Sequence, residues 1–229
     1  MTPLLLALGA ALGNLFGAAV VVRSAQRGLR FIETTLAFGA GFMLAVVLVG
    51  VFPVVFQGQP GTVGLYVLGG YLAVHLAHHV LVPHFHFGEE THAVSASVGT
   101  SALIGLSIHS FFDGVAIAAG LLQTTGLGLL LFLAVLFHKL PEGVTIASVV
   151  MAGGRPGRQA LLAASVLGLA TVLGALLTEV TAPLLQHGLA IAAGVTLYVA
   201  ASNLVPEFQN ARRGLTLAFF GGVGQAGLS

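Results

Sequence analysis

Two short stretches of this sequence pair a histidine with an acid four residues later. "HSFFDG" contains His109 and Asp113, and "HKLPEG" contains His138 and Glu142. Residues four apart on a helix share one face, so each pair points in a single direction. Imidazole and carboxylate donors together suit Zn²⁺, and also Fe²⁺, Mn²⁺ and Cd²⁺, whereas Mg²⁺ and Ca²⁺ prefer shells of oxygen alone. We therefore predict one divalent-metal site built from both pairs.

The composition places these pairs in a membrane. Of the 229 residues, 57% are hydrophobic and only 7% are charged, against about 25% charged in a soluble domain. The chain has no cysteine, which excludes disulfides and thiolate metal sites. We expect an all-α integral membrane protein forming a single transport domain. In hydrocarbon, four ionisable side chains are costly unless they are paired. A proton-sharing network that merely ties two helices together is the alternative reading of the pairs.

Apolar runs of about 20 residues predict eight transmembrane helices. Their expected ranges are 3–22, 32–56, 62–82, 95–122, 127–152, 159–182, 187–206 and 213–229. All seven arginines fall in alternate connections, namely Arg23, Arg27, Arg30, Arg155, Arg158, Arg212 and Arg213. The positive-inside rule then puts these connections and the His-rich loop 83–94 in the cytoplasm, with both termini outside. The fourth and fifth helices run antiparallel, so their polar pairs reach similar depths, roughly 16–22 Å into the bilayer.

Two segments of the chain resemble each other, and we call this similarity the internal echo. Residues 37–53 align without gaps to residues 190–206, with six of 17 positions identical, including Pro53 and Pro206. Because the second and seventh helices run in opposite directions, the echo predicts an inverted repeat, with helices 1–3 and 6–8 flanking helices 4 and 5 in a 3+2+3 arrangement. Shared membrane composition is the alternative explanation.

These motifs resemble a known family. "HSFFDGVAIAAG" and "HKLPEGVTIAS" are similar to the fourth- and fifth-helix signatures of the ZIP metal transporters, and "AAGVTLYVAASNLVPEF" is similar to their seventh helix. The His-Lys order in the second motif matches some branches of the family, and we assign the chain to the bacterial type. The resemblance implies uptake of Zn²⁺, or of Cd²⁺, Fe²⁺ or Mn²⁺, into the cytoplasm by alternating access. It also implies eight helices, metal bound between helices four and five, an elevator movement and a homodimer.

The sequence departs from the family pattern where many members bind a second metal. Ser110 and Lys139 follow the two histidines, where asparagine and an acid are common in the family. Lysine cannot ligate while protonated, so we predict one metal, with the Lys139 ammonium in place of the second. Glu179 resembles the family's sixth-helix acid, and we predict that it pairs with Lys139. On the second helix, we expect Met43 to border the site.

Histidines gather at the expected cytoplasmic end of the third helix. One interpretation is a release path for metal, formed by His75, His78, His79 and Glu207. Solvated histidines at the membrane interface are the plainer interpretation. Cytosolic histidines titrate near neutrality, so they could pass metal on weakly.

Other function classes use similar residues. An intramembrane metalloprotease would bind metal, but its H-E-x-x-H motif is missing, as is the nucleotide-binding G-x-x-x-x-G-K-[ST]. A haem protein would fit the two histidines but not the acids beside them, and a non-transporting receptor stays open. We expect no enzyme, no cofactor and no nucleotide or nucleic-acid partner. The expected partners are a divalent metal ion and the lipid bilayer of a bacterial cytoplasmic (inner) membrane.

Overall fold

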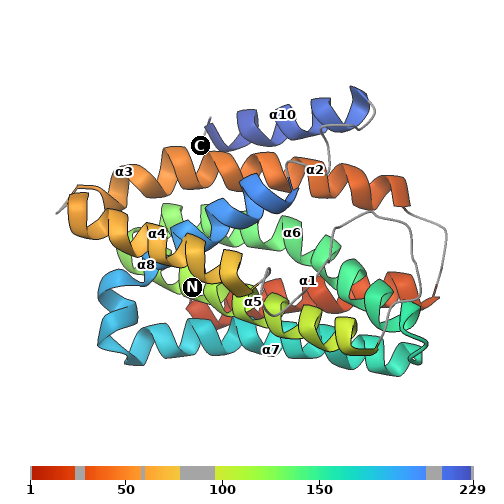
Figure 1. The fold of residues 1–229 in the computed structure, drawn as a ribbon. Coiled ribbons are helices and arrows are strands. Elements are labelled where there is room, and N and C mark those ends of the chain that lie inside the picture. Colours follow the sequence, from red (N-terminus) through yellow and green to blue (C-terminus); the bar gives the residue numbers. More distant parts are fainter. Residues whose placement is uncertain (1, 24–28, 58–59, 78–95, 205–212, 228–229) are drawn as a thin grey trace.

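Long helices make up most of the described chain and pack side by side (Figure 1). The computed structural model describes the chain apart from residues 1, 24–28, 58–59, 78–95, 205–212 and 228–229. No strand occurs in the described part, where the all-α prediction is confirmed. Helical segments there overlap each of the eight predicted ranges.

Four helices pack closely with one another and form what we call the first bundle. They are α1 (Pro3–Arg23), α5 (Ala96–Gln123), α6 (Thr125–Ala152) and α7 (Gly157–Val180). The turn between α5 and α6 is held by Thr124, whose hydroxyl accepts a hydrogen bond from the Leu127 backbone at 3.1 Å and so caps α6. The turn after α6 uses Gly154 at a positive φ of 75°, a conformation that glycine adopts without a Cβ penalty.

The remaining helices form the second bundle. They are α2 (Leu29–Ala45) with its continuation α3 (Phe52–Val55), α4 (Pro60–Leu76), α8 (Ala182–Tyr198) and α10 (Arg213–Gly227). Within it, α2 packs on α10 and α4 packs on α8, while α5 on α8 and α2 on α6 join the two bundles. The sequence predicted the connection between α7 and α8 at residues 183–186, but the structure places it at the extended residue Thr181. The helix begins earlier because Pro183 favours the first turn of a helix.

Reciprocal pairs of glycines lie where helices of one bundle touch. A side chain at Gly70 would meet the carbonyl oxygen of Ile191, and a side chain at Gly194 would meet the carbonyl oxygen of Val67. The same relation joins Gly41 with Gly222 in the second bundle, and Gly17 with Gly143 and Gly114 with Gly174 in the first. Such pairs bring two backbones into direct contact, so these helices pack closely within each bundle.

The structure repeats where the sequence does. Aligning residues 37–53 with 190–206 places the π-helical segment Val46–Val51 directly opposite a second π-helical segment, Val199–Leu204. The same alignment places Gly41 opposite Gly194, and both belong to reciprocal glycine pairs. π-helical segments are rare, so shared membrane composition does not explain this coincidence. It supports the internal repeat.

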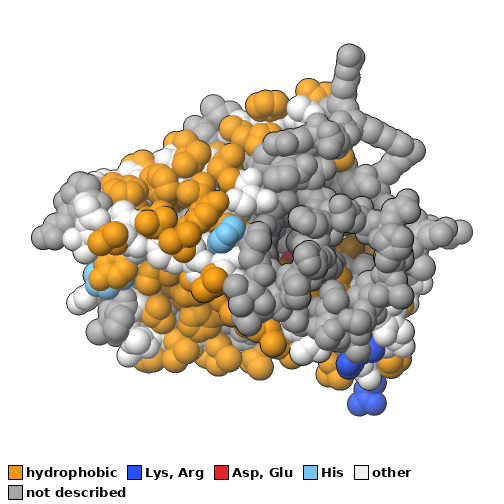
Figure 2. All heavy atoms as spheres, in the orientation of Figure 1, with side chains coloured by type: hydrophobic (Ala, Val, Ile, Leu, Met, Phe, Trp, Pro, Cys, Tyr) orange, Lys and Arg blue, Asp and Glu red, His pale blue; other side chains and the backbone are white. Residues whose placement is uncertain are grey.

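Several helices have the length and the surface of membrane spans. Among the described residues, five helical stretches are long and apolar enough to cross a bilayer: Pro3–Arg23, Ala37–Val55, Ala102–Gln123, Thr125–Ala152 and Gly157–Val180. Shorter apolar helices lie at Gly61–Leu76 and Leu215–Ala226. Large hydrophobic side chains are exposed along these helices, and Figure 2 shows them covering most of the visible described surface. This outer surface is suited to lipid.

The glycine contacts can be tested with two adjacent residues of α4. Gly70→Ala places a methyl group against the Ile191 carbonyl, whereas Gly69→Ala places one where nothing lies within 4 Å. Alanine favours helix by about 1 kcal/mol over glycine, so Gly69→Ala should leave thermal stability in detergent unchanged or raise it. Gly70→Ala should lower the free energy of unfolding by about 1–3 kcal/mol. Equal melting temperatures for the two variants would contradict the close helix contact.

Candidate metal centre

The two His-acid pairs converge at the contact between α5 and α6. One ligand atom from each of His109, Asp113, His138 and Glu142 lies within 4.8 Å of the others. All four side chains are buried, with exposed fractions between 1% and 5%. The quartet lies on α5 and α6, which are both long and apolar enough to span a membrane.

Three of these atoms form an almost regular triangle. The Nε2 atoms of His109 and His138 are 3.3 Å apart, and Asp113 Oδ2 lies 3.3 Å from the first and 3.2 Å from the second. Ligands at about 2.0–2.1 Å around a tetrahedral Zn²⁺ are separated by about 3.3–3.4 Å. The triangle therefore has the size of one face of a zinc coordination shell, and a Glu142 ligand atom lies within 4.8 Å of the other three.

The histidine ring of α6 is already oriented for a metal. His138 Nδ1 donates to the Ala134 carbonyl at 2.8 Å, which leaves Nε2 with its lone pair facing the triangle. Two other buried atoms of the centre, His109 Nδ1 and Asp113 Oδ1, have no hydrogen-bond partner within the described part of the protein. Unsatisfied buried polar atoms are costly, so the hydrogen bonds of the centre do not satisfy all of its polar atoms.

Lys139 joins the centre directly, in contact with the carboxylates of the quartet. Its Nζ atom lies 2.8 Å from Asp113 Oδ2 and 2.5 Å from Glu142 Oε2, and it donates to Ser110 Oγ at 2.7 Å. Ser110 in turn donates to Glu142 Oε1 at 2.6 Å. One ammonium thus faces two carboxylates, which is how a fully buried lysine avoids an unpaired charge.

The predicted ion pair between Lys139 and Glu179 is wrong. Glu179 is exposed near the end of α7, whereas Lys139 is fully buried beside the quartet. The error has a simple geometric cause, because Glu142 lies three residues after Lys139 on the same helix face and Asp113 faces it from α5. The lysine therefore neutralises the predicted metal ligands themselves, not a separate acid.

Asn14 is a member of the site that the sequence analysis missed. This fully buried residue of α1 lies behind Lys139 and Glu142. With its amide nitrogen facing them, it donates to the Lys139 carbonyl at 2.6 Å and to Glu142 Oε2 at 3.2 Å. An asparagine inside the first apolar span was the available signal, since polar side chains at that depth need partners.

The other predicted site residues are less decisively placed. Met43 is fully buried in the core cluster that also contains Ala134 and Ala116, and its place at the border of the site stays a prediction. His75 is exposed at the last turn of α4, where its ring packs edge-on against Tyr198 at 5.6 Å. The rest of the predicted release path (His78, His79 and Glu207) and the loop 83–94 lie outside the described residues.

Comparison with known proteins places the chain in one group. Residues 88–225 match the family described as ZIP Zinc transporter. The chain is 31% identical over 160 residues to zinc transporter ZIP9 of Xenopus tropicalis, covering 63% of this chain and 52% of the relative. It is 33% identical over 181 residues to ZIP9 of Micropogonias undulatus, covering 73% and 57%.

A bacterial relative matches over a longer stretch. Zinc transporter ZupT of Escherichia coli is 26% identical over 223 residues, covering 89% of this chain and 85% of the relative. By contrast, the chain spans about half the length of the Xenopus ZIP9 proteins that it matches. The matched family segment contains all four members of the quartet together with Lys139.

Proposed function

The chain belongs to the ZIP zinc transporter family, which is a family of transporters and not of enzymes, and from this premise we propose that it carries Zn²⁺ across a membrane into the cytoplasm. The observation that carries this proposal is the quartet of His109, Asp113, His138 and Glu142, buried between two long apolar helices. A cation that loses its water there receives two imidazoles and two carboxylates, and the carboxylates offset its charge. Cd²⁺, Fe²⁺ and Mn²⁺ are further candidate substrates for these donors.

The orientation follows from where positive charge lies. Arg155 and Arg158 lie at the connection from α6 to α7, and Arg23 ends α1. A side chain at Gly157 would come within 2.7 Å of Val22, so these arginines share one end of the bundle. The positive-inside rule makes this end cytoplasmic. We propose eight spans in an inner membrane, with both termini outside and the His-rich loop 83–94 inside.

The two bundles suggest how the site changes its exposure. All four ligands come from α5 and α6, and Asn14 from α1 supports them, so the whole site belongs to the first bundle. Glycines that face the other bundle, such as Gly39, Gly50 and Gly188, would meet a side chain first rather than a backbone. These contacts between the bundles are made first through side chains, whereas the reciprocal glycine pairs within each bundle bring two backbones together.

We propose that the first bundle moves against the second as a rigid body and carries the metal with it, as an elevator. Apolar side-chain interfaces permit sliding because no hydrogen bond need break. The second bundle would then be the static partner and the surface on which a homodimer forms, as the family resemblance implies.

The single-metal proposal rests on Lys139. Its ammonium occupies the space between Asp113 and Glu142 that a second cation would need, and Ser110 completes its contacts. A bound Zn²⁺ and this ammonium share the same carboxylate oxygens. The lysine therefore also lowers the affinity for Zn²⁺ and favours its release.

Loss of the quartet should abolish transport. His109→Ala and Glu142→Ala, reconstituted into liposomes with a zinc-sensitive dye inside, should each reduce the initial Zn²⁺ uptake rate to background, at least about tenfold, because each loses a ligand worth several kcal/mol in a dry site. Ser165→Ala is the matched control, since the exposed Ser165 hydroxyl donates to the Leu161 carbonyl of its own helix and lies outside the quartet. Undiminished uptake by both ligand variants at normal expression would refute the proposed site.

Replacing Lys139 tests the number of metals. Lys139→Asp removes the ammonium and adds a ligand, so bound zinc measured by calorimetry and elemental analysis should rise from one to two ions per chain. Lys139→Met removes the charge without adding a ligand and should stay at one. A Lys139→Asp protein that still binds a single ion would contradict the role of Lys139 as a substitute cation.

The chain has no cysteine, which permits a clean cross-linking test of the movement. A Cβ at Gly39 would lie 3.3 Å from Phe137 Cβ across the two bundles, and a Cβ at Gly168 would lie 3.0 Å from Ala11 Cβ within the first bundle. Both separations are somewhat shorter than the Cβ–Cβ distance of about 3.5–4.5 Å in a disulfide, so each pair of cysteines is close enough to be oxidised after a small shift of the helices. Oxidation of the Gly39→Cys/Phe137→Cys protein should stop uptake reversibly, whereas the Ala11→Cys/Gly168→Cys protein should keep transporting. Full uptake by the oxidised cross-bundle pair would exclude sliding at this interface.

A further inference from the structure

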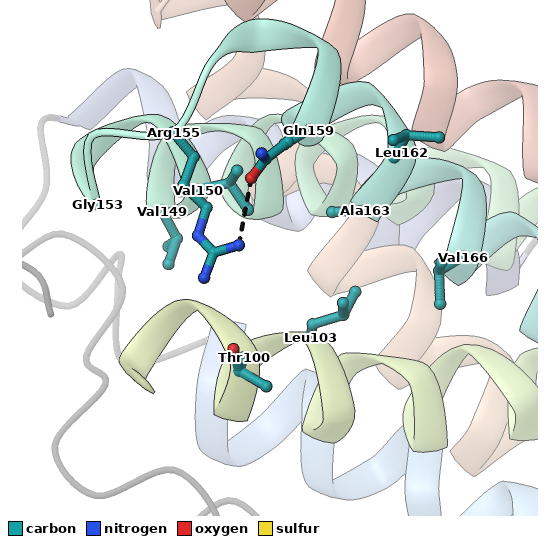
Figure 3. A pocket seen from close by; sticks show the side chains of 10 residues that line it. All are labelled: Thr100, Leu103, Val149, Val150, Gly153, Arg155, Gln159, Leu162, Ala163 and Val166. Carbon is teal, nitrogen blue, oxygen red and sulfur yellow. Dashed lines mark hydrogen bonds between the residues drawn. The ribbon is translucent and has the colours of Figure 1, made fainter. Parts of the chain in front are cut away.

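A pocket separate from the metal centre opens at the connection between α6 and α7. It has a volume of about 200 Å³, and its walls come from α5, α6 and α7 (Figure 3). None of its lining residues belongs to the quartet or contacts Lys139. The walls are mostly aliphatic, and they are formed by Leu103, Val149, Val150, Leu162, Ala163 and Val166.

A positive charge stands at one end of this pocket. Arg155 lines it, and its Nη1 donates to Gln159 Oε1 at 3.2 Å, which directs the guanidinium over the opening (Figure 3). The turn fixes the backbone as well, since the Arg155 amide donates to the Val150 carbonyl at 3.3 Å. None of the residues that line the pocket is acidic, so within it the charge has no carboxylate partner.

The other end of the pocket continues into a hydrophobic stripe. Figure 3 places Val166 at the end away from Arg155. Along α7, Leu162, Val166, Leu169 and Leu173 follow at spacings of three and four residues, which keeps them on one helix face. Between 44% and 57% of each of these side chains is exposed. In a bilayer this stripe faces hydrocarbon, while Arg155, between two spanning helices, lies at the level of the headgroups.

We propose that this pocket is a binding site for one anionic phospholipid. Its phosphate lies on the Arg155 guanidinium, and one acyl chain enters the pocket and follows the α7 stripe. The guanidinium matches phosphate with two parallel N–H donors. Basic pockets between transmembrane helices commonly take acidic headgroups. The pocket favours both parts of the ligand. A free phosphate would leave the aliphatic walls empty, and a zwitterionic lipid would bring its own cationic group close to the Arg155 guanidinium along with its phosphate.

Native mass spectrometry of the purified full chain can test whether the Arg155 charge recognises an anionic headgroup. Phosphatidylglycerol and phosphatidylcholine with identical acyl chains are added separately, and bound lipid is counted. We expect phosphatidylglycerol to bind the unaltered protein preferentially, and Arg155→Gln to weaken that binding about fivefold, as expected for one cation near an anionic headgroup. Arg23→Gln removes the same charge at the same end of the bundle but outside the pocket, and it should bind phosphatidylglycerol normally.

A second pair of variants tests whether an acyl chain enters the pocket. Val166→Trp fills the pocket from a lipid-facing position, whereas Leu169→Trp adds the same bulk to the same stripe beyond the pocket. Val166→Trp should lower phosphatidylglycerol binding several-fold, and Leu169→Trp should not. Because both positions are exposed, we expect both variants to fold, and an unchanged gel-filtration profile would check this.

Three results would overturn the proposal. Equal binding of the two lipids would show that charge is not recognised. Equal losses in Arg155→Gln and Arg23→Gln would reduce the effect to general attraction between arginines and acidic lipid. Normal binding by Val166→Trp would show that no acyl chain enters the pocket.

Discussion

The structure depends on a buried electrostatic balance between one lysine and two acids. Lys139 is fully buried and contacts both Asp113 and Glu142. Removing one partner would leave an unpaired charge in a dry interior, which costs several kcal/mol. The balance also sets the chemistry of the site, because a divalent ion must share the same oxygens. The lysine therefore neutralises the two acids of the centre, and under the proposed function it also weakens the binding of a metal ion there.

The packing around this centre separates what must be rigid from what must move. Reciprocal glycines such as Gly17 with Gly143 and Gly114 with Gly174 bring the backbones of the first bundle together. They lie on the same helices as the quartet, so in the movement that we propose the distances between the four side chains would change little. Across the bundles, side chains such as Phe137 fill the space instead. Helices in backbone contact would keep the geometry of the quartet while the side-chain interface between the two bundles slides.

Much of this arrangement was predictable from the sequence, and the exceptions have physical causes. Spacing of four residues brought His109 with Asp113 and His138 with Glu142 onto single faces, and the apolar ranges located the helices. Residue spacing does not determine which acid a flexible lysine side chain contacts. The sequence therefore suggested Glu179 as the partner of Lys139, whereas the structure pairs it with Glu142 and Asp113. Asn14 was missed because its role depends on a contact between α1 and α6, which helix periodicity does not encode.

The two π-helical segments bear on how the internal repeat arose. A π-helical turn closes with one residue more than an α-helical turn, which is the change that one inserted residue would make. Val46–Val51 and Val199–Leu204 occupy equivalent places in the two aligned segments. If the two segments descend from one duplicated ancestor, a single insertion before the duplication accounts for both bulges, whereas separate insertions would have to strike the same position twice.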